Sequence, residues 1–157
     1  MKLDLEALKA RIKPARETFP NYKMLIYGDS GVGKTSLFKD AKDTLILDVE
    51  EGTSVYQGES STDVAQITCW EDLQGYYSLL QSGDLRYTNI VLDSITEYQE
   101  LCKDYVLRSY QRNRISPDVP SQQDYGEISE KMRKMLRQFR ALDCNVIYVA
   151  RTKYTKD

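Results

Sequence analysis

Residues 28–35 read Gly-Asp-Ser-Gly-Val-Gly-Lys-Thr and match the pattern G-x-x-x-x-G-K-[ST] in full. This pattern describes a loop whose backbone N–H groups wrap around a phosphate chain. Residues 23–27, before the loop, are short and mostly apolar like a buried strand, and residues 36–40, after it, can open a helix. The N-terminus of such a helix would face the anion. The chain must therefore fold so that a strand, this loop and a helix follow one another.

The loop assigns a separate task to each kind of residue. Lys34 can reach the β- and γ-phosphates of a nucleotide, and the Thr35 hydroxyl can bind Mg²⁺. The predicted phosphate-binding residues are Gly28, Asp29, Ser30, Gly31, Val32, Gly33, Lys34, Thr35 and Ser36.

A missing residue type narrows the chemistry further. The 157-residue chain contains no histidine, which excludes Ser-His-Asp and Cys-His nucleophiles and His-ligated metals. Acid–base chemistry must then use Asp, Glu, Lys or Tyr. Phosphoryl transfer fits this limit, because it depends mainly on positioning and electrostatic stabilisation.

Composition also bounds where the protein acts. The three cysteines are widely separated and odd in number, which suits neither a zinc site nor a disulfide framework and predicts a reducing cytoplasm. No apolar run approaches the ~20 residues of a membrane span, and the N-terminus shows no signal pattern, so we expect no membrane partner. Because the net charge is −2, any DNA contact must come from a local patch.

Short apolar segments alternate with helical ones from residue 22 onward. The predicted strands are 22–27, 44–49, 64–68, 89–93 and 145–149. The predicted helices are 34–41, 70–81, 95–111 and one that follows Asp124 with an apolar stripe from Ile128 to Leu142. Each strand looks buried on both faces, which is typical of parallel strands joined by right-handed crossovers. The sequence therefore predicts an α/β fold with a mainly parallel five-stranded sheet flanked by helices.

The organisation predicts one core with a short preceding segment. We expect an N-terminal helical segment over 1–20, with a helix over 3–13 that Pro14 ends, and a nucleotide-binding core over 21–157. Residues 51–63 and 112–124 are predicted to be loops. Three capping boxes are expected to begin helices: Thr68 with Glu71, Ser94 with Glu97, and Asp124 with Glu127.

Asp93 ends an apolar strand and is followed by Ser94, as expected of a Walker B element. Ligands of open α/β sheets bind at the carboxyl ends of strands. The Asp93 carboxylate is therefore predicted to hold Mg²⁺ opposite Thr35. The alternative is an ordinary acid at the end of a strand.

Two further strand ends carry charges. Glu50, followed by Glu51, could orient and deprotonate the attacking water, or the two could form a solvated acidic turn. Arg151 follows the fifth strand and could stabilise the γ-phosphate in its own subunit or in a neighbour. Lys153 is a weaker candidate for the same role. The alternative for both basic residues is an exposed charge near the terminus.

Residues 108–125 carry a basic and aromatic cluster. Arg108, Arg112 and Arg114 surround Tyr110, just before a segment rich in Pro and Gln. Cations beside a flexible, aromatic-bearing loop suit single-stranded DNA, because phosphates meet the cations and bases stack on the ring. The basic residues of the following helix are better explained as a solvated face: Lys131, Arg133, Lys134, Arg137 and Arg140.

At this point the chain resembles the RecA-like ATPases, and more closely the small phage-encoded ATP-binding proteins of that class, some of which are single-strand annealing proteins. The resemblance lies in residues 25–36, 45–50, 90–94 and 145–151, in the expected order. It implies that Glu50 is the catalytic carboxylate and that residues 111–126 correspond to a DNA-binding loop. Lys34 and Arg151 are the other predicted catalytic residues, because each could place a positive charge at the γ-phosphate. The resemblance also implies a homo-oligomer, a ring or a filament, with the nucleotide between subunits.

The chain departs from that family at two points. Ala150-Arg151 stands where recombinases usually carry a polar amide, and the sequence ends shortly after the fifth strand, where RecA-like domains commonly continue. We therefore expect either a minimal or a C-terminally shortened member, in the host cytoplasm if phage-encoded.

The sequence predicts an Mg²⁺-dependent ATPase that acts on single-stranded DNA in recombination or annealing. A GTPase is not expected, because no Asp-x-x-Gly follows Asp93 and no Asn-Lys-x-Asp follows the fifth strand. Two alternatives stay open. One is a small-molecule kinase, with residues 108–125 as a lid, and the other is a nucleotide-gated assembly module with little turnover.

Overall fold

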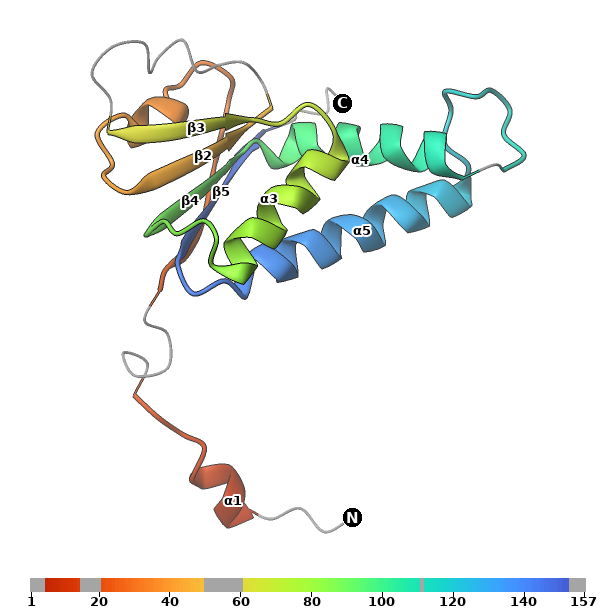
Figure 1. Ribbon diagram of the computed structural model, residues 1–157. Helices are drawn as coiled ribbons and strands as arrows, with labels where there is room; N and C mark the ends of the chain where they lie inside the picture. Colours follow the sequence, from red (N-terminus) through yellow and green to blue (C-terminus); the bar gives the residue numbers. More distant parts are fainter. Residues whose placement is uncertain (1–4, 15–20, 50–60, 111, 153–157) are drawn as a thin grey trace.

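A computed structural model describes residues 5–14, 21–49, 61–110 and 112–152. Its centre is a sheet of five parallel strands in the order β1-β5-β4-β2-β3 (Figure 1). The strands are β1 (Lys23–Gly28), β2 (Thr44–Asp48), β3 (Thr62–Gln66), β4 (Asn89–Asp93) and β5 (Asn145–Arg151). The predicted α/β fold with a parallel five-stranded sheet is confirmed.

Three long helices cover one face of this sheet (Figure 1). They are α3 (Trp70–Ser82), α4 (Ile95–Ser109) and α5 (Gln122–Arg140). The helices α1 (Leu5–Lys9) and η1 (Thr35–Phe38) are short, and none of the residues in α1 is buried. Among the helices in the described ranges, none combines the length and the apolar character that a membrane crossing requires.

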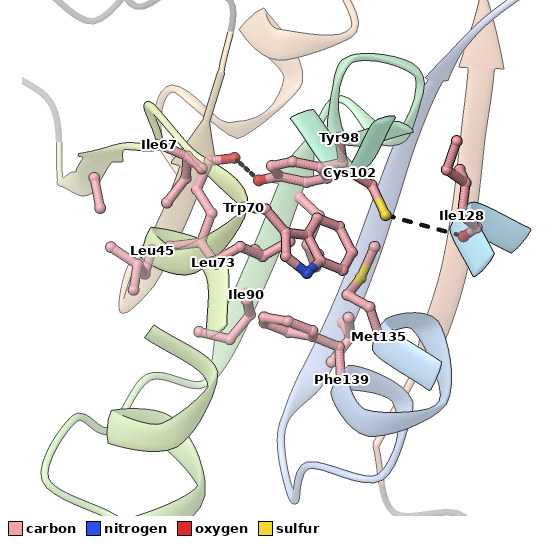
Figure 2. Packing of buried hydrophobic residues seen from close by; sticks show 14 of the residues in the cluster. Leu45, Ile67, Trp70, Leu73, Ile90, Tyr98, Cys102, Ile128, Met135 and Phe139 are labelled. Carbon is pink, nitrogen blue, oxygen red and sulfur yellow. Dashed lines mark hydrogen bonds between the residues drawn. The ribbon is translucent and has the colours of Figure 1, made fainter. Parts of the chain in front are cut away.

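The main core lies between these three helices and the sheet (Figure 2). Strand residues alternate between faces, so Leu45 and Leu47 of β2 point to the helices while Ile46 points to the other side. Tyr98 of α4 is fully buried, and its hydroxyl donates to the Leu47 carbonyl oxygen at 2.7 Å. The large buried side chains from the helices include Trp70, Leu73, Tyr98, Met135 and Phe139. Each contributes about 1.5–3 kcal/mol through burial of apolar surface.

A smaller apolar cluster lies on the opposite face. Ile46, Val91, Ile147 and Val149 form it, with Phe38 of η1 packed against them. This cluster seats η1 on the face toward which Asp48 and Asp93 also project by strand alternation.

Strand β1 lies at an edge of the sheet and, among the described residues, pairs only with β5. Three of its apolar side chains are largely exposed, with exposed fractions of 48% for Met24, 60% for Leu25 and 70% for Tyr27. The phosphate loop therefore follows a strand that is supported from one side.

Several element boundaries differ from the sequence-based expectation. The helix expected over 34–41 is the single 3-10 turn η1, and the helix expected over 3–13 is α1. The strand expected over 64–68 begins two residues earlier, at Thr62. Its hydroxyl donates to the Phe38 and Ala41 carbonyl oxygens at 2.6 and 3.1 Å, so side-chain hydrogen bonding fixes the start of β3.

Two of the three predicted capping boxes were wrong in position. Helix α3 begins at Cys69 with Asp72, because the Asp72 carboxylate accepts hydrogen bonds from the backbone N–H groups of Thr68 and Cys69. Helix α5 begins at Ser121, whose backbone N–H and hydroxyl donate to Asp124. Asp124 is thus the partner of the cap, not the cap itself.

Candidate active site

The carboxyl ends of β1, β4 and β5 bring the phosphate loop, Asp93 and Arg151 to one edge of the sheet. Gly31 and Gly33 adopt positive φ angles of 79° and 87°. Glycine tolerates this conformation because it has no Cβ. Gly33 is a fixed glycine of the loop pattern, so its positive φ explains that requirement, whereas Gly31 stands at a variable position of the pattern.

Lys34 folds back across the loop that it ends. Its ammonium donates to the carbonyl oxygens of Gly28 and Asp29 at 2.8 and 2.6 Å. The positive charge is therefore held above the loop backbone, where a phosphate chain would also lie.

Thr35 and Asp93 meet although 58 residues separate them in sequence. The Thr35 hydroxyl donates to a carboxylate oxygen of Asp93 at 2.6 Å, and β5 lies between the strands that lead to the two residues. Asp93 is 5% exposed. A hydroxyl and a carboxylate oxygen are hard donors of the kind that Mg²⁺ prefers, so the pair fits this ion.

The described residues contain no group of three or more acidic, His or Cys side chains arranged to hold a metal ion. Mg²⁺ usually keeps several waters and binds through one or two protein ligands and the phosphates of a nucleotide.

Asp48 is a candidate active-site residue that the sequence analysis did not identify. It ends β2, is paired in register with Asp93 on β4, and is 1% exposed. Burial, and then the negative charges of Asp93 and Asp48, raise the pKa of Tyr98 well above its ordinary value. The sequence pointed past it, because the predicted strand 44–49 extends one residue beyond Asp48, whereas β2 ends at Asp48.

Arg151 lies beside the start of the loop, in register with Gly28. Its Nη1 atom is 3.5 Å from a carboxylate oxygen of Glu97, and its backbone N–H donates to the Thr96 hydroxyl at 3.2 Å. The next residue, Thr152, donates through its backbone N–H to the Gly28 carbonyl oxygen at 3.3 Å and through its hydroxyl to the Asp29 carboxylate. The end of β5 is thus tied to both the loop and α4.

Helix α4 begins at Ser94, as the sequence predicts, but this residue makes no side-chain cap hydrogen bond. Glu97, the expected partner in a capping box, pairs with Arg151 instead. The remaining candidates, Glu50, Glu51 and Lys153, lie outside the described residues.

The arginines near Tyr110 are largely engaged within the protein. Asp124 is fully buried and accepts hydrogen bonds from Arg112 at 2.8 Å and from Arg114 at 2.8 and 2.9 Å. Hydrogen bonds from Arg114, and then from Ser121 and Arg112, hold the pKa of Asp124 far below its usual range.

Arg108 differs from these two arginines. Its side chain is 64% exposed and lies 3.8 Å from the Glu71 carboxylate. Together with Tyr110, the arginines line a hollow of about 550 Å³. The Arg112 guanidinium lies 4.6 Å from the centroid of the Tyr110 ring.

Comparisons with known proteins bear on the family and the fold. A family model described as an AAA domain matches residues 20–157. The fold is similar to a solved structure of a prototypical ATPase from the type III secretion system of pathogenic bacteria, with a TM-score of 0.57 and 16% sequence identity. That similarity covers 87% of this chain and 47% of the other chain. No curated protein matches the sequence.

Proposed function

Because the chain belongs to the AAA domain family of P-loop ATPases, we propose that it binds ATP together with Mg²⁺ and hydrolyses it. The observation that carries this proposal is the 2.6 Å hydrogen bond from the Thr35 hydroxyl to the Asp93 carboxylate. It joins the last residue of the phosphate loop to the strand-end acid, which are the two protein groups that an Mg²⁺–nucleotide complex requires.

The loop would bind the phosphates through its backbone N–H groups, with Lys34 supplying a positive charge at the β- and γ-phosphates. Thr35 and Asp93 would hold Mg²⁺, which when bound neutralises charge on the phosphate oxygens. Lys34 already lies over the loop backbone, so a bound phosphate would replace carbonyl oxygens as its partner.

Glu50 is our candidate for orienting and deprotonating the attacking water. The backbone N–H of Val49, the residue before it, donates to the Asp93 carbonyl oxygen at 2.9 Å, so the main chain reaches the site at this point. A general base must lie within hydrogen-bond reach of the proton that it removes. Arg151 is our candidate for stabilising charge that develops on the γ-phosphate.

The test is steady-state ATP hydrolysis with Mg²⁺, alongside ATP binding by calorimetry. Lys34→Ala should abolish both binding and turnover, because the charge at the phosphates is lost. Glu50→Gln should keep ATP binding and lower turnover by about 10²–10⁴-fold. Lys134→Ala, an exposed lysine on α5, is the matched control and should match the wild type.

Two results would count against this assignment. Tight ATP binding by the Lys34→Ala variant would contradict the proposal that the loop binds the phosphates. Binding without any turnover in the wild type would favour a nucleotide-gated assembly module instead.

A second proposal concerns the partner. We propose that the protein assembles as a ring or filament and acts on single-stranded DNA, in recombination or annealing, through residues 108–125. The hollow lined by Arg108, Tyr110 and Arg112 supports it, because cations and aromatic rings together suit a single strand. Since Asp124 engages Arg112 and Arg114, Arg108 would carry most of the contact with phosphate.

Arg108→Ala should weaken binding to a single-stranded oligonucleotide and lower the slope of log affinity against log salt by about 0.7. Arg133→Ala is the matched control, since this arginine is 69% exposed on α5, and it should change neither quantity. An absence of single-strand binding at low salt, with and without ATP, would remove DNA from the proposal.

A further inference from the structure

The side chain of Arg151 pairs with α4, the helix that directly follows Asp93. Along β5, Ile147 and Val149 pack in the cluster on the η1 face, while Tyr148 packs on the helix face. Alternation therefore assigns Arg151 to the η1 face. Its guanidinium nevertheless pairs with Glu97 of α4, at 3.5 Å.

Helix α4 packs on the helix face, where Tyr98, Cys102 and Val106 are fully buried. Its first turn directly follows Asp93, so Glu97 is carried by the same segment as a candidate Mg²⁺ ligand. The pair is also accessible, with 36% of the Arg151 side chain and 33% of the Glu97 side chain exposed. An ion pair of this exposure is weak and can be displaced by a stronger anion.

A γ-phosphate is such an anion. The Arg151 backbone lies in register with Gly28, the first residue of the phosphate loop, and Thr152 contacts both Gly28 and Asp29. Arginine forms charge-assisted, often bidentate hydrogen bonds with phosphate, which are stronger than an exposed pair with a carboxylate.

We propose that Glu97 is a positioning residue that restrains Arg151 until a γ-phosphate draws it away. This inference rests on the proposed ATPase function. It makes Glu97 a competitor of the nucleotide: Glu97 weakens the binding of ATP, which carries the γ-phosphate, and leaves the binding of ADP unchanged. Release of Arg151 would also remove a contact of the first turn of α4. The presence of the γ-phosphate would thereby affect the helices that pack on the sheet.

The experiment is calorimetric titration of the full chain with Mg²⁺ and either AMP-PNP, a non-hydrolysable ATP analogue, or ADP. Glu97→Gln should bind AMP-PNP about two- to fivefold more tightly than the wild type, the range that an exposed ion pair allows. Affinity for ADP should not change. Arg151→Ala should weaken AMP-PNP binding alone, and the double variant should behave like Arg151→Ala.

Glu100→Gln is the matched control, because Glu100 lies on the same helix and pairs with Lys103 at 2.6 Å, away from the loop. It should bind both nucleotides like the wild type. Thermal denaturation of each variant separates this prediction from a loss of folding, since a purely structural role for Glu97 would lower the melting temperature without changing the preference for AMP-PNP over ADP.

Three results would overturn the inference. Equal changes in AMP-PNP and ADP affinity for Glu97→Gln would contradict competition with the γ-phosphate. An effect of Glu97→Gln that persists in the Arg151→Ala background would show that it does not act through Arg151. A wild type that binds neither nucleotide would instead defeat the proposed function, and this inference with it.

Discussion

At the scale of single residues, the site depends on a few polar side chains that are held by others. Thr35 donates to Asp93, and Asp93 is nearly inaccessible to solvent. Burial strengthens electrostatic interactions because the local dielectric is low. Replacing the Asp93 carboxylate by a neutral amide should therefore have a large effect on Mg²⁺-dependent ATP binding and a small effect on the fold.

Asp93→Asn tests this at the candidate Mg²⁺ site. The amide keeps the shape and can still accept from the Thr35 hydroxyl, but it removes the negative charge. We expect the stimulation of ATP binding by Mg²⁺ to fall by at least tenfold, measured as affinity with Mg²⁺ against affinity with EDTA. Asp84→Asn, on the exposed turn after α3, is the control. An unchanged response to Mg²⁺ would remove Asp93 from the metal site.

Asp124 is the residue whose charge state should govern acid stability. Its folded-state pKa lies below its unfolded value of about 3.9, so its stabilising contribution is complete above that unfolded value. The contribution is lost as the pH falls below about 4 toward the folded-state pKa. Urea denaturation between pH 7 and pH 3 should show a steeper loss of stability for the wild type than for Asp124→Asn. Parallel curves would contradict this account.

At the scale of elements, hydrophobic pattern and capping explain most of the fold. The five strands and the stripe on α5 were correctly predicted, because apolar runs and helical spacing leave a clear pattern in sequence. The expected burial of every strand on both faces was wrong for β1, whose side chains are largely exposed. The caps of α3 and α5 were misplaced because several nearby polar residues could serve as caps. Sequence spacing does not decide which carboxylate the backbone N–H groups meet.

The parts of the candidate site that could be predicted from sequence are those that depend on local motifs. The loop is a local motif, so its position could be read directly, and Asp93 followed from its strand. The pairing of Arg114 with Asp124 and of Arg151 with Glu97 depends on how helices pack against the sheet. No local pattern records such contacts, so arginines that look free in sequence turn out to have partners.

Helix α5 should depend on its cap. The Ser121 side chain accepts from the Asp124 backbone N–H at 3.3 Å. Ser121→Ala should lower the free energy of unfolding by about 1 kcal/mol, measured by urea denaturation. Ser78→Ala, on the exposed side of α3, should change it by less than about 0.5 kcal/mol. Equal effects of the two substitutions would show that the cap contributes little.

At the scale of the whole molecule, the exposed edge strand is the feature that favours association. Apolar side chains of β1 are largely exposed, and within the described ranges the strand pairs on one side alone, with β5. The other side of an edge strand can pair with another chain. A heterologous contact of this kind generates rings if it closes and filaments if it does not, which is the assembly proposed above. Leu25→Lys should therefore reduce the average mass measured by light scattering at high protein concentration, and an unchanged mass would place the contact elsewhere.

The order of the strands also determines when each strand can pair during synthesis of the chain. Of the strands that the structure describes, the first, β1, pairs with the last, β5, and three others lie between them in sequence. During translation, the phosphate loop would emerge well before its supporting neighbour, by roughly 6–24 s at ordinary rates of about 5–20 residues per second. In that interval the nascent chain contains the whole phosphate loop but lacks β5, the strand that pairs with β1. Chaperones that bind exposed apolar strands could bind β1 during this interval.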